Sequence, residues 1–379
     1  MGDAPIIFDP ARESLEKFTK RCAPRRTVDA YRELLRDLFL VRNPRFKFAP
    51  PQAKEVDAFI ESVRGKQFLE ELGTWVYFPW NESLVHYLPE AEHQELRTAR
   101  NRNLITADEQ RRFYNAHVGI AGLSVGSHVA LILAMTGGAR HMKLADPDML
   151  SGDNLNRIRE GYPSIGEKKA LLVARKLWEI DPYLRLELFL DGITEGNTPQ
   201  FLDGLNVLVE EMDNPYMKFK IREEARARKI PVVMGTDNGD GIIVDIERYD
   251  RRDDTPLFNG LVGNLTAEKL RTMSPKDLPK IAAQIAGADR AVGRMLASVL
   301  EVGKTLYSWP QLGTAASLCG SVVTYLVRRI VLGAPNITSG RYEVNLDAMF
   351  ESDYGWKWFS RKADFVKFVR AMKQKSSSA

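Results

Sequence analysis

The chain has 379 residues, which is enough for two or three domains with substantial cores. Apolar residues make up 44% and charged residues 27%, as in ordinary soluble globular proteins, which excludes a disordered or fibrous chain. The 54 Lys and Arg exceed the 50 Asp and Glu by only four, so charge alone does not indicate nucleic-acid binding. Two cysteines, Cys22 and Cys319, are too few for a four-cysteine zinc site or a disulfide framework. The N-terminus has no basic-then-apolar signal peptide, and a reduced, cytoplasmic setting is expected.

One segment, residues 306–327, has no charged side chain and approaches the roughly 20 residues that a membrane span needs. Pro310 and Gly313 interrupt it, and Ser, Thr and Gln are scattered through it. We therefore expect a buried core helix there and no membrane partner.

The first hundred residues are predicted to be mostly helical. Apolar residues recur at helical spacing in three segments, 11–22, 27–42 and 51–64. The aromatic run WVYFPW at 75–80 has the composition of a strand and contains a terminating proline. A mainly helical N-terminal region over residues 1–95 is expected.

From about residue 115, short apolar runs alternate with helix-length segments. The strand-sized runs are HVGIAG, HMKLAD, LRLELFL, NVLVEEMD and IPVVMGT. Helical periodicity occupies the segments near 127–137, 167–180 and 215–228. This alternation is typical of βαβ units. It predicts an α/β fold, with a Rossmann-like, mostly parallel sheet and helices on both faces.

Beyond residue 250 the pattern predicts helices again, over 267–303 and 312–332, and a further strand at 341–347. The α/β domain is accordingly expected to span residues 96–350. Residues 351–379 are expected to form a C-terminal helical segment with a disordered tail, KQKSSSA.

A glycine-bearing turn, GLSVGS, follows the first strand of this domain and precedes a helix. Such a turn presents bare backbone N–H groups and a positive helix end to phosphate. Asp146 follows Gly126 by 20 residues, the spacing at which an acid that ends the second strand meets a nucleotide ribose. The turn and the acid together indicate a nucleotide site.

The same letters spell G-x-S-x-G, the nucleophile elbow of α/β-hydrolases. That interpretation requires an acid and then a histidine further along the chain. No histidine lies beyond His141, only seventeen residues after Ser124, which leaves no room for an intervening acid strand. The hydrolase is excluded, and Ser124 is interpreted as a small residue tolerated where the turn approaches phosphate.

Polar residues gather where the later strands end, the edge at which open α/β sheets bind ligands. They lie in the segments DPD (146–148), DNLNR (153–157), GEKK (166–169) and EEMDN (210–214). Cations that hold phosphates and a carboxylate that holds Mg²⁺ suit ATP.

In this order, the glycine turn and these segments resemble the ThiF/MoeB/ubiquitin-activating-enzyme superfamily, whose members adenylate carboxylates. The match covers about residues 97–250 and implies that residues 96–350 are an ATP-binding adenylation domain. The positions that the resemblance places at ATP are Gly122, Ser124, Gly126, Asp146, Asp148, Asn154, Arg157 and Lys169.

The resemblance also implies a role for particular side chains. Asp146 would bind the ribose, and Asn154, Arg157 and Lys169 the phosphates. Asp213 would organise Mg²⁺ at the reacting phosphate, so Asp213, Arg157 and Lys169 are the expected catalytic residues. Arg100 lies in a segment similar to the family's R-x-x-R-Q, whose arginine completes the partner's ATP site, so a homodimer is implied.

Several features depart from the family's pattern. Ala121, Leu123 and Ser124 stand in a turn that is usually richer in glycine, and Glu210 replaces the first Asp of its motif. No cysteine lies between Asn214 and Gly313, where many members carry a thioester-forming thiol, and the C-x-x-C zinc motifs are missing. The first hundred residues more resemble the leader of a bacterial ThiF-like subgroup.

The charged residues proposed for the ATP site also have structural interpretations. Arg157, Lys169 and Arg100 could be solvated surface charges, and Asp148 and Asp153 could be turn formers or helix caps. Asp213 and Asn214 could simply begin the helix at 215–228.

The function that the sequence favours is Mg·ATP-dependent adenylation of a carboxylate, as in ubiquitin-like modifier activation, without a thioester cysteine. The substrate could be the C-terminus of a ubiquitin-like protein, a peptide or a tRNA-linked carboxylate. The alternative is a nucleotide-binding or catalytically weak scaffold. A nicotinamide oxidoreductase would leave Arg157, Lys169 and Asp213 without a role.

Overall fold

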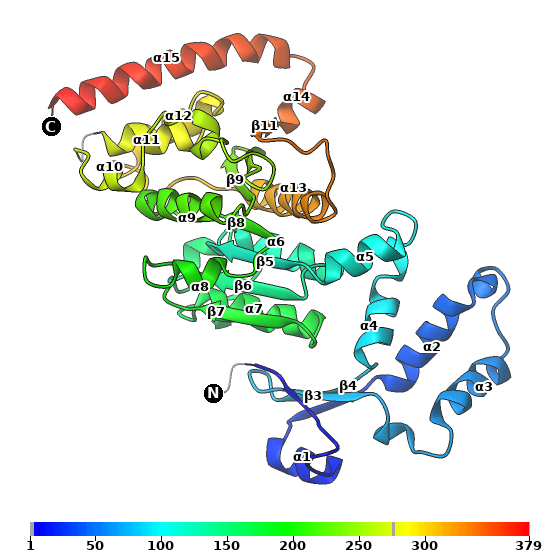
Figure 1. Ribbon diagram of the computed structural model, residues 1–379. Helices are drawn as coiled ribbons and strands as arrows, with labels where there is room; N and C mark the ends of the chain where they lie inside the picture. Colours follow the sequence, from blue (N-terminus) through cyan, green and yellow to red (C-terminus); the bar gives the residue numbers. More distant parts are fainter. Residues whose placement is uncertain (1–3, 275–276, 379) are drawn as a thin grey trace. The chain divides into compact units, whose positions relative to one another are not determined.

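The computed structural model describes residues 4–274 and 277–378, which divide into two compact units (Figure 1). Unit 1 contains residues 1–111 and 175–184, and unit 2 contains residues 112–174 and 185–379. Among the described residues, no helix combines the length and the apolar character needed to cross a membrane.

Unit 1 is built from helices and a four-stranded sheet of order β1-β3-β4-β2. Its strands are β1 (Ile6–Ile7), β2 (Arg26–Asp29), β3 (Thr74–Phe78) and β4 (Ser83–Tyr87). Its helices are α1 (Leu15–Cys22), α2 (Tyr31–Arg42), α3 (Ala53–Arg64) and α4 (Glu90–Arg97), and α5 (Ala107–Tyr114) crosses into unit 2.

The helices α1, α2 and α3 lie close to the three segments predicted as helical, but α4 and the strand β2 were not predicted. The four residues of β2 overlap the start of the predicted helix 27–42, whereas the helix begins at Tyr31. The strand exists because it pairs in parallel with β4, where Val28 is in register with Val85. This pairing joins segments far apart in the sequence, and helical periodicity contains no information about it.

Unit 2 is built on a seven-stranded sheet of order β11-β10-β9-β8-β5-β6-β7. Its strands are β5 (His117–Ala121), β6 (His141–Ala145), β7 (Arg185–Phe189), β8 (Val207–Glu210), β9 (Val232–Asn238), β10 (Gly241–Glu247) and β11 (Gly340–Val344). The five strands from β9 to β7 are mutually parallel, whereas β10 is antiparallel to both of its neighbours, β9 and β11. The predicted Rossmann-like, mostly parallel sheet is confirmed.

Helices cover both faces of this sheet (Figure 1). The helices of unit 2 are α6 (Gly126–Met135), α7 (Lys169–Ile180, which continues into unit 1), α8 (Thr198–Leu202), α9 (Pro215–Ala227), α10 (Ala267–Arg271), α11 (Leu278–Ile285), α12 (Gly293–Glu301), α13 (Gly313–Val331), α14 (Leu346–Phe350) and α15 (Tyr354–Ser378). On one face, Phe201 and Phe219 pack with the strand residue Leu208. On the other, α13 packs against α6 and β9, with Cys319 directly over Gly235.

The C-terminal segment is helical, as predicted, and packs on α12 through the cluster that contains Leu296 and Phe368. The helix α15 extends through Ser378, although the sequence predicted disorder from Lys373 onwards. Ala379 lies outside the described residues.

Candidate functional site

The glycine turn of unit 2 connects β5 to the amino end of α6 and is tightly enclosed. Gly122 has φ +92°, and a Cβ there would lie 2.4 Å from the carbonyl oxygen of Glu211. A Cβ on Gly126 would lie 2.9 Å from the side chain of Ile120. Because only glycine fits at Gly122, the backbone can turn sharply there between β5 and α6.

Asp146 fastens this turn to the end of β6. Its Oδ2 accepts a hydrogen bond from the N–H of Leu123 (2.6 Å), and its Oδ1 accepts one from the N–H of Asp148 (2.8 Å). Asp146 is 4% exposed, and this burial raises its pKa although the two N–H groups and Lys169 oppose the effect. The predicted spacing between the turn and the acid therefore corresponds to a direct contact.

Two cationic side chains flank the turn. Arg157 donates from Nε to Oγ of Ser124 (3.0 Å) and from Nη1 to Oδ1 of Asn156 (2.9 Å). Lys169 is 7% exposed, and its Nζ lies 2.9 Å from Oδ2 of Asp148. Both cations are thus held within the polar edge of the sheet, where an anion can exchange with their present partners.

Asn154 shapes the segment that carries Arg157. It is 6% exposed, and its Oδ1 accepts a hydrogen bond from the N–H of Ser151 (3.3 Å) in a capping box. Its amide nitrogen lies 3.4 Å from the Asp153 carboxylate. In this structure Asn154 positions the loop, and its contact with phosphate stays a prediction.

The segment after β8 passes directly beside the glycine turn. The N–H of Glu211 donates to the carbonyl of Ala121 (2.7 Å), and Asn214 begins α9 by accepting from the N–H of Met217 (3.1 Å). Asp213 lies between them and is exposed. The N-cap interpretation is right for Asn214, and it leaves the Asp213 carboxylate accessible.

Magnesium binding by this edge would rest on few protein ligands. Within residues 4–274 and 277–378, no three His, Cys, Asp or Glu side chains are grouped so that they could hold a metal ion. Mg²⁺ in nucleotide sites is commonly held by one or two carboxylates together with phosphate oxygens and water. A magnesium role for the exposed carboxylate of Asp213 stays a prediction.

The sequence reasoning missed Asp237 and Gln311. Asp237, at the end of β9, accepts from the side-chain amide of Gln311 at its Oδ2 (3.2 Å). Its Oδ1 is buried without a hydrogen-bond partner among the described residues. Burial raises the pKa of Asp237 to about 6, while the Gln311 bond and the charge of Arg157 oppose the rise. The only signal in the sequence was the polar pair Asp237-Asn238, which directly follows the apolar run IPVVMGT.

Gln311 also joins the segment before α13 to the Arg157 loop. Its backbone carbonyl accepts a hydrogen bond from Nδ2 of Asn156 (2.7 Å). Gly313 lies so close to the same Asn156 that a Cβ on Gly313 would be 2.7 Å from the backbone carbonyl oxygen of Asn156. Contacts therefore run from Ser124 through Arg157, Asn156 and Gln311 to Asp237.

Arg100 belongs to unit 1, where it is exposed in the short 3₁₀ turn Ala99–Asn101. The other predicted site residues belong to unit 2. A role for Arg100 in the ATP site of a second subunit stays a prediction.

A sequence model described as the ThiF family matches residues 98–361. The chain belongs to the ThiF family. It is 38% identical over 310 residues to an uncharacterised protein, MT1398, of Mycobacterium tuberculosis, a match that covers 79% of this chain and 43% of that protein. It is 32% identical over 137 residues to tRNA threonylcarbamoyladenosine dehydratase of Escherichia coli, covering 35% of this chain and 50% of the enzyme.

The chain thus spans about half, or less, of the length of these two curated relatives. Among solved structures it is similar to PaaA, with a TM-score of 0.50 and 18% identity, covering 68% of this chain and 80% of that one. This structural likeness supports the ThiF fold. The family resemblance predicted from the order of the motifs is confirmed.

Proposed function

We propose that this ThiF-family protein adenylates a carboxylate with Mg·ATP and releases pyrophosphate. One observation carries the proposal, namely that Arg157 lies on the glycine turn and bonds to Ser124 at the amino end of α6. This places a guanidinium, a tight glycine turn and a positive helix end together, which is the chemistry that binds phosphate.

In the proposed reaction, an oxygen of the substrate carboxylate attacks the α-phosphorus of ATP, and the bond to the pyrophosphate oxygen breaks. Arg157, Lys169 and the N–H groups at the start of α6 stabilise the negative charge that develops on the phosphate oxygens. Magnesium, held by Asp213 and the phosphates, would neutralise charge on the leaving group. Asp146 contributes the ribose contact expected from the family.

The acyl-adenylate would not pass to a thiol of this chain. Cys319 is fully buried, and burial together with Glu211 and Asp237 raises the pKa of its thiol well above the ordinary value. Cys22 belongs to unit 1, and burial also raises its pKa. Since the thiolate is the nucleophile, both thiols are poor acceptors. The acyl group would instead pass to an amine, a partner's cysteine or an internal nucleophile that completes a dehydration.

A tRNA-linked carboxylate is the first substrate to test, because a 32% identical relative is named a tRNA threonylcarbamoyladenosine dehydratase. The C-terminus of a ubiquitin-like protein and a peptide carboxylate are the other candidates. We further propose a cytoplasmic homodimer in which Arg100 contributes to the partner's site.

Titration calorimetry with Mg·ATP, with NAD as the comparison, tests the nucleotide site. Mg·ATP should bind and raise the unfolding temperature, since a ligand that binds only the folded state stabilises by mass action. Arg157→Ala should weaken this binding, and the matched variant Arg159→Ala, an exposed arginine two residues away, should not. Stronger stabilisation by NAD than by saturating Mg·ATP would refute the proposal.

Asp213→Ala then separates binding from chemistry. In ATP–pyrophosphate exchange with each candidate carboxylate, this variant should lose orders of magnitude in rate while staying folded, because a metal organiser is removed from an exposed position. Unfolding of the variant, or turnover equal to the parent, would contradict the assigned role.

A nucleotide-binding scaffold is the second candidate, and one observation favours it. The N–H of Leu123 already donates to Asp146, so this N–H of the turn is not free for phosphate. Mg·ATP binding without exchange, with all three carboxylate classes supplied, is the result expected of the scaffold.

A further inference from the structure

The guanidinium of Arg157, which bonds to the glycine turn, is held by neutral oxygens. Its Nε donates to Oγ of Ser124 (3.0 Å), and its Nη1 donates to the carbonyl of Asp153 (3.1 Å) and to Oδ1 of Asn156 (2.9 Å). Among the residues that the structure describes, no carboxylate forms an ion pair with Arg157, and its Nη2 makes no hydrogen bond. The guanidinium therefore keeps its charge and unused donors for an incoming anion.

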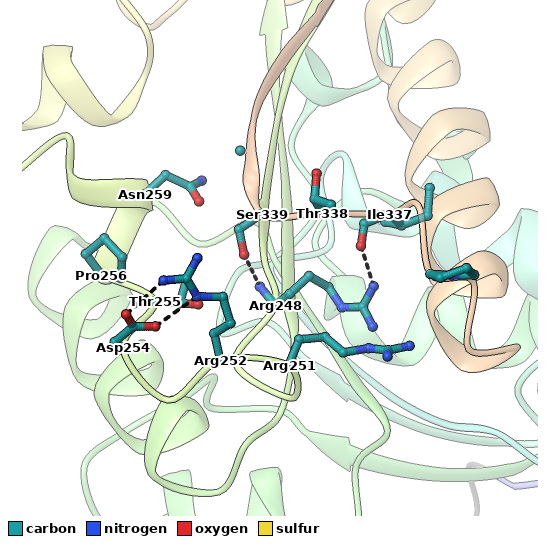
Figure 2. Close-up of a pocket in the computed structure, with 12 residues that line it drawn as sticks. Arg248, Arg251, Arg252, Asp254, Thr255, Pro256, Asn259, Ile337, Thr338 and Ser339 are labelled. Carbon is teal, nitrogen blue, oxygen red and sulfur yellow. Dashed lines mark hydrogen bonds and ion pairs between the residues drawn. The ribbon is translucent and has the colours of Figure 1, made fainter.

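Arg248, at the opposite edge of the sheet, is held in the opposite way. It lines a cavity of about 570 Å³ and is 2% exposed (Figure 2). Its Nε and Nη2 pair with the carboxylate of Asp250 (2.8 and 2.7 Å), and its Nη1 donates to the carbonyl of Ile337 (2.6 Å). A carboxylate that fixes a guanidinium also neutralises its charge, so Arg248 is a structural cation.

The main chain of Arg157 has an anchor of its own in α6, the buried side chain of His128. Nε2 of His128 bonds to the carbonyl of Arg157. A carbonyl can only accept, so this bond places the ring proton on Nε2. Nδ1 is buried without a hydrogen-bond partner among the described residues, and burial lowers the pKa of His128 although the bond to the carbonyl opposes the effect. A neutral imidazole thus fixes the Arg157 main chain and adds no charge to the site.

The packing of α13 on α6 fixes His128 in turn. Gly320 lies so close to His128 that a Cβ on Gly320 would be 2.6 Å from the Cβ of His128. One turn further along α13, Oγ1 of Thr324 donates to the carbonyl of Val129 (3.4 Å). The imidazole is therefore held by two packed helices before any ligand binds, which lowers the entropic cost of ordering the site.

We propose, on the basis of the ATP site proposed above, that His128 is a positioning residue, which holds the main chain of Arg157 so that the guanidinium meets the phosphates of ATP. Ser124 fixes the side chain of Arg157 and His128 fixes its backbone, so two contacts four residues apart in sequence define where the charge lies. Neutral partners leave the attraction for phosphate intact, whereas a carboxylate such as the one on Arg248 would compete with it. His128 acts through Arg157 and exchanges no proton in the reaction.

Two substitutions separate the hydrogen bond from the volume of the side chain. His128→Gln keeps an N–H donor near the position of Nε2, whereas His128→Leu fills a similar volume and leaves the Arg157 carbonyl unpaired. In titration calorimetry with the full chain, His128→Leu should weaken Mg·ATP binding about tenfold, because a displaced guanidinium loses a charge-assisted hydrogen bond to phosphate. His128→Gln should weaken it less than threefold. If His128→Leu does not fold, His128→Asn, whose amide is too short to reach the carbonyl, takes its place.

A double-variant cycle with Arg157→Ala tests whether His128 acts through Arg157. Arg157→Ala removes the guanidinium and keeps the carbonyl to which His128 donates. In this background His128→Leu should change Mg·ATP affinity less than twofold, and it should lower the urea midpoint of unfolding as much as it does in the parent. A tenfold loss of affinity in both backgrounds, or equal losses in His128→Gln and His128→Leu, would overturn the proposal.

Ser339→Ala is the matched control, because Oγ of Ser339 accepts a hydrogen bond from the N–H of Arg248 (2.9 Å) and so anchors the main chain of the other arginine (Figure 2). This variant should lower the urea midpoint and change Mg·ATP affinity less than twofold. An affinity loss equal to that of His128→Leu would assign both effects to general destabilisation and overturn the proposal. A parent chain that does not bind Mg·ATP contradicts the adenylation proposal itself, whereas a parent that binds, with unchanged affinity in His128→Leu, contradicts the role of His128 alone.

Discussion

Two buried carboxylates lie at the carboxyl ends of the neighbouring strands β8 and β9, and they differ in how completely they are partnered. Glu210 is fully buried and pairs with Arg222 and with Lys218 (3.1 Å). Asp237 is 9% exposed, accepts one bond from Gln311, and has a buried oxygen without a partner among the described residues.

The pKa directions follow from this difference. Burial alone would raise the pKa of Glu210, but the charges of Lys218 and Arg222 outweigh it and lower the pKa. At Asp237 burial dominates, and the pKa rises to about 6. The comparison separates two uses of a buried acid. Glu210 belongs to a completed network of ion pairs, whereas Asp237 retains unmet capacity to accept a hydrogen bond and lies within the electrostatic range of Arg157.

The largest expected effect comes from breaking the completed network at Arg222. This side chain is fully buried, bonds to Glu210, and donates from Nε to Glu247 (2.7 Å), which in turn accepts from the hydroxyl of Tyr249 (2.5 Å). Arg222→Met should leave two buried carboxylates without their shared cation and reduce the free energy of unfolding by about 3–5 kcal/mol.

Urea denaturation measures this loss. Lys229→Met is the matched control, because Lys229 and Asp253 form an exposed pair (64% and 78% exposed) that should contribute less than about 1 kcal/mol. A small loss in Arg222→Met, similar to that of the control, would show that the network does not hold this part of unit 2 together.

The raised pKa of Asp237 should make the folded state less stable as the pH rises, the opposite of the direction expected from the lowered pKa of Glu210. Its folded pKa of about 6 lies above the ordinary value of 3.8, so the folded protein retains a proton that the unfolded chain releases. The stability that this proton provides is complete below pH 3.8 and is lost as the pH rises through 6. A shift of about two units corresponds to roughly 3 kcal/mol.

Asp237→Asn removes this ionisation, and it should raise stability at pH 8 by about 1–3 kcal/mol and change it little at pH 4.5. Denaturation midpoints at both pH values measure the difference. Asp191→Asn, at a side chain that is 96% exposed, is the control and should show no such dependence. Equal effects of Asp237→Asn at both pH values would contradict the elevated pKa.

The sheet of unit 2 could be predicted from the sequence because of how its strands are buried. Strands covered on both faces give continuous apolar runs, and the predicted helix 312–332 is observed at Gly313–Val331. The contact between Asp237 and Gln311 joins residues 74 apart that belong to no motif. Its unpartnered oxygen depends on how β9 packs under the segment before α13, which sequence periodicity does not encode.

Substitution of Gln311 tests the raised pKa of Asp237 through a smaller expected change in stability. Gln311→Ala removes the bond that opposes the rise in the pKa of Asp237, so this pKa should increase further. The free energy of unfolding should fall by about 1–2 kcal/mol at pH 8, where Asp237 is ionised, and by less at pH 5. Gln311→Glu places a second carboxylate beside Asp237 and should lose more at pH 8. An equal loss at both pH values would assign Gln311 to packing alone.

The smallest expected effect is at Cys319, which lies on the face of the sheet covered by α13, where burial and the charges of Glu211 and Asp237 raise the pKa of its thiol. Its thiol is fully buried, and a Cβ on Gly235 would lie only 2.1 Å from its Sγ, so the sulfur fills the space that Gly235 leaves open. Cys319→Ala should reduce the free energy of unfolding by about 1 kcal/mol through a small cavity and leave adenylation unchanged.

Gly235→Ala alone should reduce the free energy of unfolding more than Cys319→Ala does, because the new methyl group overlaps the sulfur. In the double variant, the new methyl group occupies the space that the sulfur vacates. Its loss in free energy of unfolding should therefore be smaller than the sum of the losses of the two single variants. Denaturation of the parent, both single variants and the double variant measures this coupling. Additive losses would show that the sulfur does not fill this space. An acyl adduct on Cys319 that dithiothreitol reverses would contradict the assignment of this thiol as a packing residue, since a sulfur enclosed between α13 and β9 has no path to an acyl-adenylate.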